Sequence, residues 1–180
     1  MLTLIRKRVS IDPLANAKDW EMLLDEGLGA GWFFDSLLED ISEDAARVRA
    51  NCPRSVRDMV AHVADVNYGV ANILEAFTRG RSLLYEQDSL NRGAGRRPFA
   101  EVRADHASSL QRLAESTGKP LNPKQVSWHY QYGRLNGKEW LATVVAHYAY
   151  HTRQLERIKS SSMFRTAGSS TSRSHKEQAS

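Results

Sequence analysis

The sequence predicts an all-α protein, built as a four-helix bundle with long loops between its helices. Two observations lead to this fold. Apolar residues recur at alternating steps of three and four along four separate stretches, and no stretch shows the apolar–polar alternation of a half-buried strand. Four such helices of about 20 residues, each about 30 Å long, bury their apolar stripes most simply against one another. The chain of 180 residues has the length of one domain.

The first helix is predicted to run from Trp20 to Ile41. Its apolar stripe includes two glycines, which allow two different arrangements. They permit a neighbouring helix to approach closely, or they kink or split the helix that carries them. The stripe consists of Trp20, Leu24, Gly27, Gly31, Phe34, Leu38 and Ile41.

The second helix is predicted to open between Pro53 and Ser55, with Ser55 as its N-cap, because proline and serine are favoured at helix starts. A loop rich in glycine and arginine is expected to follow it, from Gly80 to Pro98. The stripe of this second helix consists of Met59, Val63, Val66, Val70, Ile73 and Phe77.

The third helix is predicted to stop at Gly118 and Pro120, and the fourth to start between Asn136 and Glu139. The segment between them, 122–137, is rich in aromatic residues and has no helical period, so we expect it to be irregular. The third stripe consists of Phe99, Val102, His106, Leu110 and Leu113, and the fourth of Leu141, Val144, Tyr148, Leu155 and Ile158.

Three parts are expected along the chain. Residues 1–10 form a basic N-terminal segment, residues 11–159 form the four-helix-bundle metal-binding domain, and residues 160–180 form a disordered tail. The tail is rich in serine and poor in large apolar groups, so it cannot offset the entropy lost when a chain becomes ordered.

The net charge of +4 is concentrated at the two ends of the chain. Arg6, Lys7 and Arg8 lie near the start and a further basic excess follows Lys159, so the body between them has no basic excess. Nucleic-acid binding is therefore not expected as the main function. No apolar run approaches the roughly 18 residues of a membrane span, so no membrane partner is expected. The single cysteine, Cys52, excludes an internal disulfide and favours a cytoplasmic location.

Three histidines are predicted to point into the same bundle interior. His147 and His151 are four residues apart, which places them on one face of the fourth helix, and that face also carries apolar residues. His62 lies at the edge of the buried stripe of the second helix. Neutral imidazoles bind Zn²⁺ or Ni²⁺ well, and three of them leave a coordination position open for water or substrate. The alternative is that these are ordinary hydrogen-bonded core histidines.

Two motifs resemble those of the DinB/YfiT-like superfamily. The second helix contains PRSVRDMVAHVADVNYGV, a serine-led start followed by a histidine in an H-x-x-D context. The fourth contains QYGRLNGKEWLATVVAHYAYHTRQLERI, an HxxxH pair with glutamine three residues further on. The resemblance covers roughly residues 15–159. It departs from the family before the second helix, where Cys52, Pro53 and Arg54 stand in place of a frequent tryptophan.

The resemblance implies a four-helix bundle in which His62, His147 and His151 bind one divalent metal. It also implies a metal-dependent thiol transferase or isomerase that uses a low-molecular-weight thiol on a small electrophile, with a stress or detoxification role. Peptidase chemistry is not expected, because Tyr148 stands where a zinc protease has its glutamate after the first histidine. Two alternatives remain: a non-catalytic metal-stabilised module, of which a homodimer is one form, and a metal-dependent hydrolase.

Supporting residues follow from their position beside the three histidines. Asp65, three residues after His62, is expected either to accept a hydrogen bond from a ligand imidazole or to be a solvated residue. Gln154, three after His151, matches a family position. Tyr148 and Tyr130 are expected to donate to a metal-bound group or to pack in the core. His106 faces inward on the third helix and is a candidate to approach the site. His129 is a candidate to line the mouth of a pocket.

Overall fold

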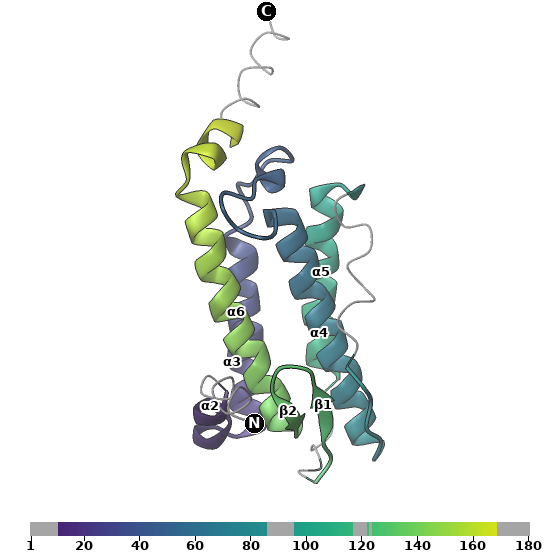
Figure 1. Cartoon of the computed structure of the whole chain (residues 1–180). Coiled ribbons are helices and arrows are strands. Elements are labelled where there is room, and N and C mark those ends of the chain that lie inside the picture. The colour runs from purple at the N-terminus through teal and green to yellow at the C-terminus, as the bar shows by residue number, and fades with distance from the viewer. Residues whose placement is uncertain (1–10, 86–95, 117–121, 123, 169–180) are drawn as a thin grey trace, which may run out of the picture.

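Four long helices lie side by side and enclose one apolar core (Figure 1). The structure is a computed structural model, and it describes residues 11–85, 96–116, 122 and 124–168. The predicted N-terminal segment 1–10 lies outside these residues, as does part of the predicted Gly80–Pro98 loop. The four helices are α3 (Trp20–Ser36), α4 (Val56–Thr78), α5 (Phe99–Glu115) and α6 (Gly137–Lys159). The predicted all-α bundle is confirmed.

The two helices that carry the three histidines both start with a capping box. In α4, the Ser55 hydroxyl accepts a hydrogen bond from the Asp58 backbone N–H at 3.1 Å. In α6, Asn136 Oδ1 accepts from the Glu139 backbone N–H at 3.1 Å, and the Glu139 carboxylate accepts from the Asn136 N–H at 2.8 Å. Each cap satisfies backbone groups that a helix end otherwise leaves without partners. Both predicted starts are therefore confirmed.

The α3 helix packs closely against α5 and α6 through its glycines. A Cβ atom on Gly31 would lie 2.3 Å from Leu110 Cδ2 and 3.0 Å from the Tyr148 ring. One on Gly27 would lie 3.3 Å from Val144 Cγ1. Because α3 is continuous from Trp20 to Ser36, close approach is the arrangement that the glycines serve, not a kink.

Two details of the predicted first helix are wrong. The fully buried leucine of its stripe is Leu23, whereas Leu24 is half-buried. The helix also ends at Ser36, and the apolar positions Leu38 and Ile41 are buried from a turn that follows it. Burial continues past the helix end because the chain folds back over the core, which a helical period cannot signal.

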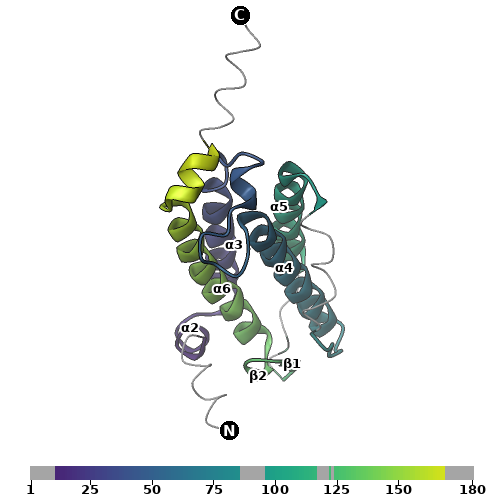
Figure 2. The same ribbon diagram turned by 45° about the horizontal axis from the view of Figure 1, so that its top comes forward.

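The segment 122–137, predicted to be irregular, contains a short antiparallel hairpin. Strands β1 (Ser127–His129) and β2 (Gly133–Leu135) pair Ser127 with Leu135 and His129 with Gly133. Gly133 has a φ of 79°, which suits glycine at such a turn. Three residues per strand are too few to show an alternation in sequence. In Figure 2 the hairpin lies at the end of the bundle where α6 begins.

The connection from α3 to α4 crosses the opposite end of the bundle, where α4 begins (Figure 1). It contains a short 3₁₀ helix, η1 (Ala45–Arg47), in which Ala45 and Ala46 are buried. A short helix, α2 (Asp12–Ala17), precedes α3. Neither was predicted, because each is shorter than two turns and shows no period.

The predicted disordered tail is wrong for its first part. Residues 162–168 are helical, and Phe164 and Ala167 pack against the core. The Ser161 hydroxyl accepts a hydrogen bond from the Phe164 N–H at 3.2 Å, which caps the turn. One aromatic side chain and one cap are enough to extend the order beyond α6. Residues 169–180 lie outside the described part of the chain.

Candidate metal centre

His62, His147 and His151 meet in the interior of the bundle. His147 Nε2 lies 3.1 Å from His62 Nε2 and 3.0 Å from His151 Nε2. One nitrogen from each ring lies within 4.8 Å of the other two. The side chains of His62 and His151 are 4% and 2% exposed, whereas His147 is half-buried. Within the described residues, this is the one group of three potential metal ligands of these types.

The helix geometry explains this convergence. His147 and His151 are one turn apart on α6, so both rings leave the same face. His62 approaches from α4, which packs against that face of α6. The predicted inward orientation of all three side chains is present in the structure.

The spacing of the three nitrogens suits a bound cation. If His147 Nε2 carries a proton, that one N–H can be directed at only one of its two neighbours; if it carries a lone pair, its contact with the lone pair of His151 Nε2 is repulsive unless a cation lies between them. Three imidazole nitrogens around a tetrahedral Zn²⁺ would lie about 3.3 Å apart at Zn–N distances of about 2.05 Å. The contacts of 3.0 and 3.1 Å are close to that value.

All three rings are neutral at physiological pH, the state that binds a metal. Burial lowers the pKa of His62 to about 3, with smaller contributions from Arg54 and His151. Burial lowers the pKa of His151 to about 4, although its hydrogen bond to Gln154 opposes the shift. Burial also lowers the pKa of His147 well below its ordinary value. The charge of Arg54 contributes in all three cases, so a cation lies near the cluster.

Gln154 holds the ring of His151. Gln154 Oε1 lies 2.7 Å from His151 Nδ1, and the side chain is buried. A carbonyl oxygen accepts from an N–H, so Nδ1 carries the ring proton and Nε2 presents its lone pair to the other two histidines. This is the orienting contact that a metal-ligating histidine typically makes.

Asp65 lies in a half-buried position on α4. Its Oδ2 atom is buried and has no hydrogen-bond partner among the described residues. Burial raises the pKa of Asp65 to about 6, with a further contribution from Asp105. One oxygen of this half-buried carboxylate is therefore out of contact with solvent, and a hydrogen bond from a ligand imidazole to Asp65 stays a prediction. The orienting hydrogen bond found at a cluster histidine is the one from His151 Nδ1 to Gln154 Oε1.

Tyr148 and His106 belong to a different polar network, on another face of α6. The Tyr148 hydroxyl accepts from Asn67 Nδ2 at 2.7 Å and lies 2.9 Å from His106 Nε2. His106 Nδ1 lies 3.5 Å from Asp35 Oδ1. Consecutive positions on a helix point about 100° apart, so Tyr148 leaves the face that His147 occupies. The expected approach of His106 to the histidine cluster is not found.

His129 is buried on β1 among aromatic rings, so it does not line an open pocket mouth. It stacks on Tyr85 with ring centroids 5.6 Å apart and on Tyr130 with centroids 4.8 Å apart. Its Nδ1 accepts from the Gln131 backbone N–H at 3.0 Å. Tyr130 itself is half exposed.

Sequence reasoning missed Tyr150. Its hydroxyl accepts a hydrogen bond from Gln154 Nε2 at 2.8 Å, and its ring packs edge-on against His151 with centroids 5.1 Å apart. The signal available in the sequence was its spacing, four residues before Gln154. An exposed aromatic residue on a helix does not otherwise stand out.

The fold and the cluster define a class of protein: an all-α bundle whose facing helices bring three histidines to one point, as metal-binding bundles do. A family model for the DinB superfamily matches residues 34–155, which include all three histidines. The chain therefore belongs to the DinB superfamily. No curated protein and no solved structure gave a significant match to the chain.

Proposed function

We propose that this protein is a divalent-metal-dependent enzyme with an open three-histidine site formed by His62, His147 and His151. The observation that carries the proposal is the convergence of three neutral Nε2 atoms, one pair 3.1 Å apart and another 3.0 Å apart. Zn²⁺ and Ni²⁺ are the metals that suit imidazole ligands in this number. Three protein ligands leave a position for a substrate.

We propose thiol-transfer chemistry on a small electrophile as the reaction. When bound, the metal would act as a Lewis acid that favours the thiolate form of an external thiol. The sulfur would form a bond to the electrophilic carbon, while the bond to the leaving group breaks and its electron pair departs with that group. The thiol proton passes to solvent or to the leaving group, so no oxidant or reductant is needed.

The charge near the cluster supports an anionic ligand at the open position. Arg54 lies beside the N-cap of α4, and its charge acts on all three histidines. A thiolate is an anion, and a nearby cation stabilises it relative to the neutral thiol.

Cys52 is not the proposed nucleophile. It is half-buried in the connection before α4, and the proposed reaction uses an external thiol. The expected small-molecule substrate, cytoplasmic location and stress or detoxification role belong to this proposal.

A second candidate is a non-catalytic module that a metal stabilises. The low exposure of the cluster favours this candidate. His62 and His151 are almost fully buried, and a structural metal site needs no access for substrate. A metal-dependent hydrolase would use the same ligands with water at the open position.

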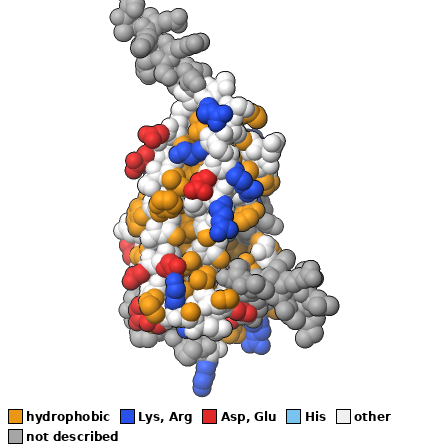
Figure 3. Space-filling model, turned by 90° about the vertical axis from the view of Figure 1, so that its left-hand side faces the viewer, with side chains coloured by type: hydrophobic (Ala, Val, Ile, Leu, Met, Phe, Trp, Pro, Cys, Tyr) orange, Lys and Arg blue, Asp and Glu red, His pale blue; other side chains and the backbone are white. Residues whose placement is uncertain are grey.

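A homodimer remains a proposal as well. Exposed apolar side chains on the described surface include Trp32, Phe33 and Tyr150. On the face drawn in Figure 3, hydrophobic side chains lie among acidic and basic ones instead of forming one unbroken apolar area.

None of the described helices is apolar over a length that would cross a bilayer.

Metal content separates these candidates from an empty histidine cluster. We would purify the protein without a histidine tag and compare wild type with His62→Ala and His147→Ala by elemental analysis. One metal per chain is expected in wild type and much less in either variant. His106→Gln is the matched control, because His106 is equally buried but lies outside the cluster. Metal at wild-type levels in both alanine variants would disprove the site.

Turnover then separates enzyme from module. The metal-loaded protein would be assayed with several low-molecular-weight thiols and a small electrophile. The quantity measured is the rate at which free thiol disappears. Faster loss than with the metal-free protein, abolished in His62→Ala, supports the transferase. Stoichiometric metal without turnover of any thiol favours the module, and turnover of an ester without a thiol favours the hydrolase.

A further inference from the structure

A chain of two hydrogen bonds connects the outer face of α6 to the histidine cluster. His151 Nδ1 contacts Gln154 Oε1 at 2.7 Å, and Gln154 Nε2 donates to the Tyr150 hydroxyl at 2.8 Å. His151 and Gln154 are buried, at 2% and 5% exposure, whereas Tyr150 is 56% exposed. The chain therefore runs from solvent to a candidate metal ligand within one turn of helix.

The orientation of the Gln154 amide decides which nitrogen of His151 can bind a metal. In the arrangement present, Oε1 accepts from Nδ1–H, and Nε2 has a free lone pair. If the amide were turned end for end, its NH₂ group would face Nδ1 and the ring proton would move to Nε2. That proton would then occupy the ligand atom. The amide beside this candidate ligand thus has to be kept in place, with Oε1 at Nδ1.

Tyr150 anchors the other end of the amide. Its hydroxyl oxygen accepts from Nε2, and its ring packs edge-on against His151 at an interplanar angle of 75°. The amide is consequently held at both ends, by a ring nitrogen and by a phenol oxygen. A phenol hydroxyl can also donate, so this bond anchors the amide beside His151 without itself selecting one end. Without the hydroxyl, the side chain would lose this anchor and could leave Nδ1.

We propose that Tyr150 is a positioning residue of the metal centre: through Gln154 it holds His151 with Nε2 directed at His62 and His147. The proposal rests on the proposed function, because it assigns a role toward the metal in that same site. Tyr150 does not contact the cluster nitrogens through its hydroxyl, so its effect would be on metal affinity and ring tautomer.

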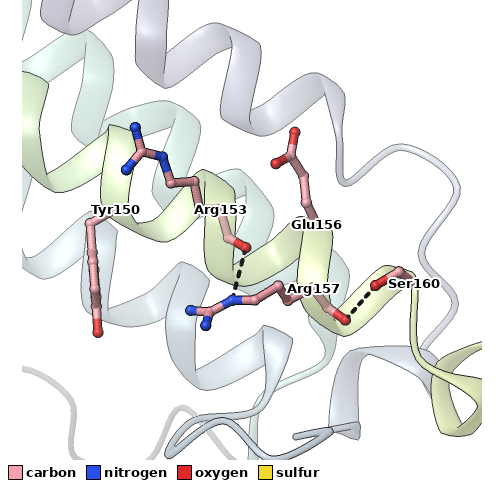
Figure 4. Close-up of a pocket in the computed structure, with 5 residues that line it drawn as sticks. All are labelled: Tyr150, Arg153, Glu156, Arg157 and Ser160. Carbon is pink, nitrogen blue, oxygen red and sulfur yellow. Dashed lines mark hydrogen bonds between the residues drawn. The ribbon is translucent and has the colours of Figure 1, made fainter.

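The surroundings of Tyr150 supply matched controls. It lines a surface depression of about 680 Å³ together with Arg153, Glu156, Arg157 and Ser160 (Figure 4). The bonds drawn between these residues stay within α6 and its end: Arg157 Nε donates to the Arg153 carbonyl, and Ser160 Oγ to the Arg157 carbonyl. Of the five, Tyr150 is the residue with a described hydrogen bond to Gln154.

The test is a double-mutant cycle measured by metal titration of the metal-free protein. Tyr150→Phe is expected to weaken Zn²⁺ binding by about three- to tenfold, and Gln154→Ala by about 10- to 100-fold, the range for residues that orient metal ligands. Arg153→Gln, in the same depression, should leave binding unchanged.

Gln154→Ala makes the test specific to positioning. Without the amide, the hydrogen-bonded link from Tyr150 to His151 is gone. Adding Tyr150→Phe to Gln154→Ala should therefore change Zn²⁺ affinity by less than twofold, roughly the scatter of independent sites. An equal loss in both backgrounds would mean that Tyr150 acts through general stability, and no loss in the wild-type background would also overturn the proposal.

A spectroscopic measurement keeps this test separate from that of the proposed function. Nitrogen-15 NMR of the metal-free protein reports which ring nitrogen of His151 carries the proton. Wild type should show the proton on Nδ1, and Tyr150→Phe should show a larger share on Nε2. If wild type binds no metal, the proposed function fails, but a shift of the His151 proton would still support the positioning role. An unchanged tautomer would disprove it.

Discussion

His62 Nε2 on α4 lies 3.1 Å from His147 Nε2 on α6, although the two residues are 85 positions apart in the chain. This contact brings a residue of α4 and a residue of α6 together in the candidate site. The α4 and α6 helices pack against each other with His62 and His147 on the facing sides, and this packing brings the two rings together. A metal bound there would link the two helices and thereby oppose unfolding.

The first prediction is that a bound metal stabilises the wild-type fold. A ligand that binds the native state alone, at a hundred times its Kd, adds about 2.7 kcal/mol to the free energy of unfolding. Adding Zn²⁺ to the metal-free protein should raise its Tm, and adding a chelator should reverse the change. Scanning calorimetry measures this directly. The Tm of His62→Ala should not respond, and an equal rise in that variant would contradict a site that uses His62.

The second prediction concerns acid stability and depends on Asp35. The pKa of this carboxyl is lowered to about 2, chiefly by the His106 ring and further by Arg103, whose Nη2 donates to Oδ2 at 2.8 Å. Because its folded pKa is below the unfolded value of 3.8, Asp35 adds stability that is complete above pH 4 and is lost as the pH falls toward 2. The difference amounts to about 2 kcal/mol.

Urea unfolding between pH 2 and 5 tests this prediction. The free energy of unfolding of Asp35→Asn should fall less steeply below pH 4 than that of wild type. Asp25→Asn, an exposed carboxyl on the same helix, is the control and should retain the wild-type slope. A parallel curve for Asp35→Asn would show that the contacts of Asp35 with His106 and Arg103 have no net effect on stability.

Much of the fold and the three candidate ligands could be predicted from sequence, because both depend on helical spacing. His147 and His151 share a face at any i,i+4 spacing, and His62 follows the stripe of α4. The network of Asp35, Asn67 and Tyr148 could not be predicted. Its members come from three helices, and its contacts depend on how those helices rotate against one another, which single-helix periodicity does not determine.

The wrong predictions have a different physical origin. The β1–β2 hairpin and the ordered segment 162–168 are short, so neither has enough residues to show a period. Each instead depends on particular contacts: His129 is buried among aromatic rings in the hairpin, and Phe164 packs on the core from beyond α6. Tertiary contacts of this kind override a composition rich in serine.

The third prediction uses the glycines of α3 as a matched pair. A methyl group on Gly31 would collide with Leu110 and touch Tyr148, both fully buried, whereas one on Gly29 would meet nothing within 4 Å. Gly31→Ala should therefore lower the free energy of unfolding by about 1–3 kcal/mol. Gly29→Ala should raise it by about 0.5–1 kcal/mol, because alanine favours the helix. Denaturant unfolding of both variants measures the difference, and equal effects would contradict the close packing of α3 on α5 and α6.

The last prediction concerns the C-terminal segment and compares residues 161–168 with residues 169–180. Phe164 is half-buried against the core, and Ser161 caps the turn before it. Truncation after Gly168 should leave the free energy of unfolding unchanged, whereas truncation after Ser160 should lower it. Phe164→Ala in the full chain should lower it by about 1–2 kcal/mol, less than for a fully buried phenylalanine, because the side chain buries only part of its surface.

Metal binding supplies the counter-test for these truncations. Residues 161–180 contribute none of the three cluster histidines, so both shortened chains should retain the metal stoichiometry of wild type. If truncation after Ser160 changes neither stability nor metal content, the contact of Phe164 with the core does not stabilise the fold. If it removes the metal, the segment supports the site through α6, whose last turns follow Gln154 directly.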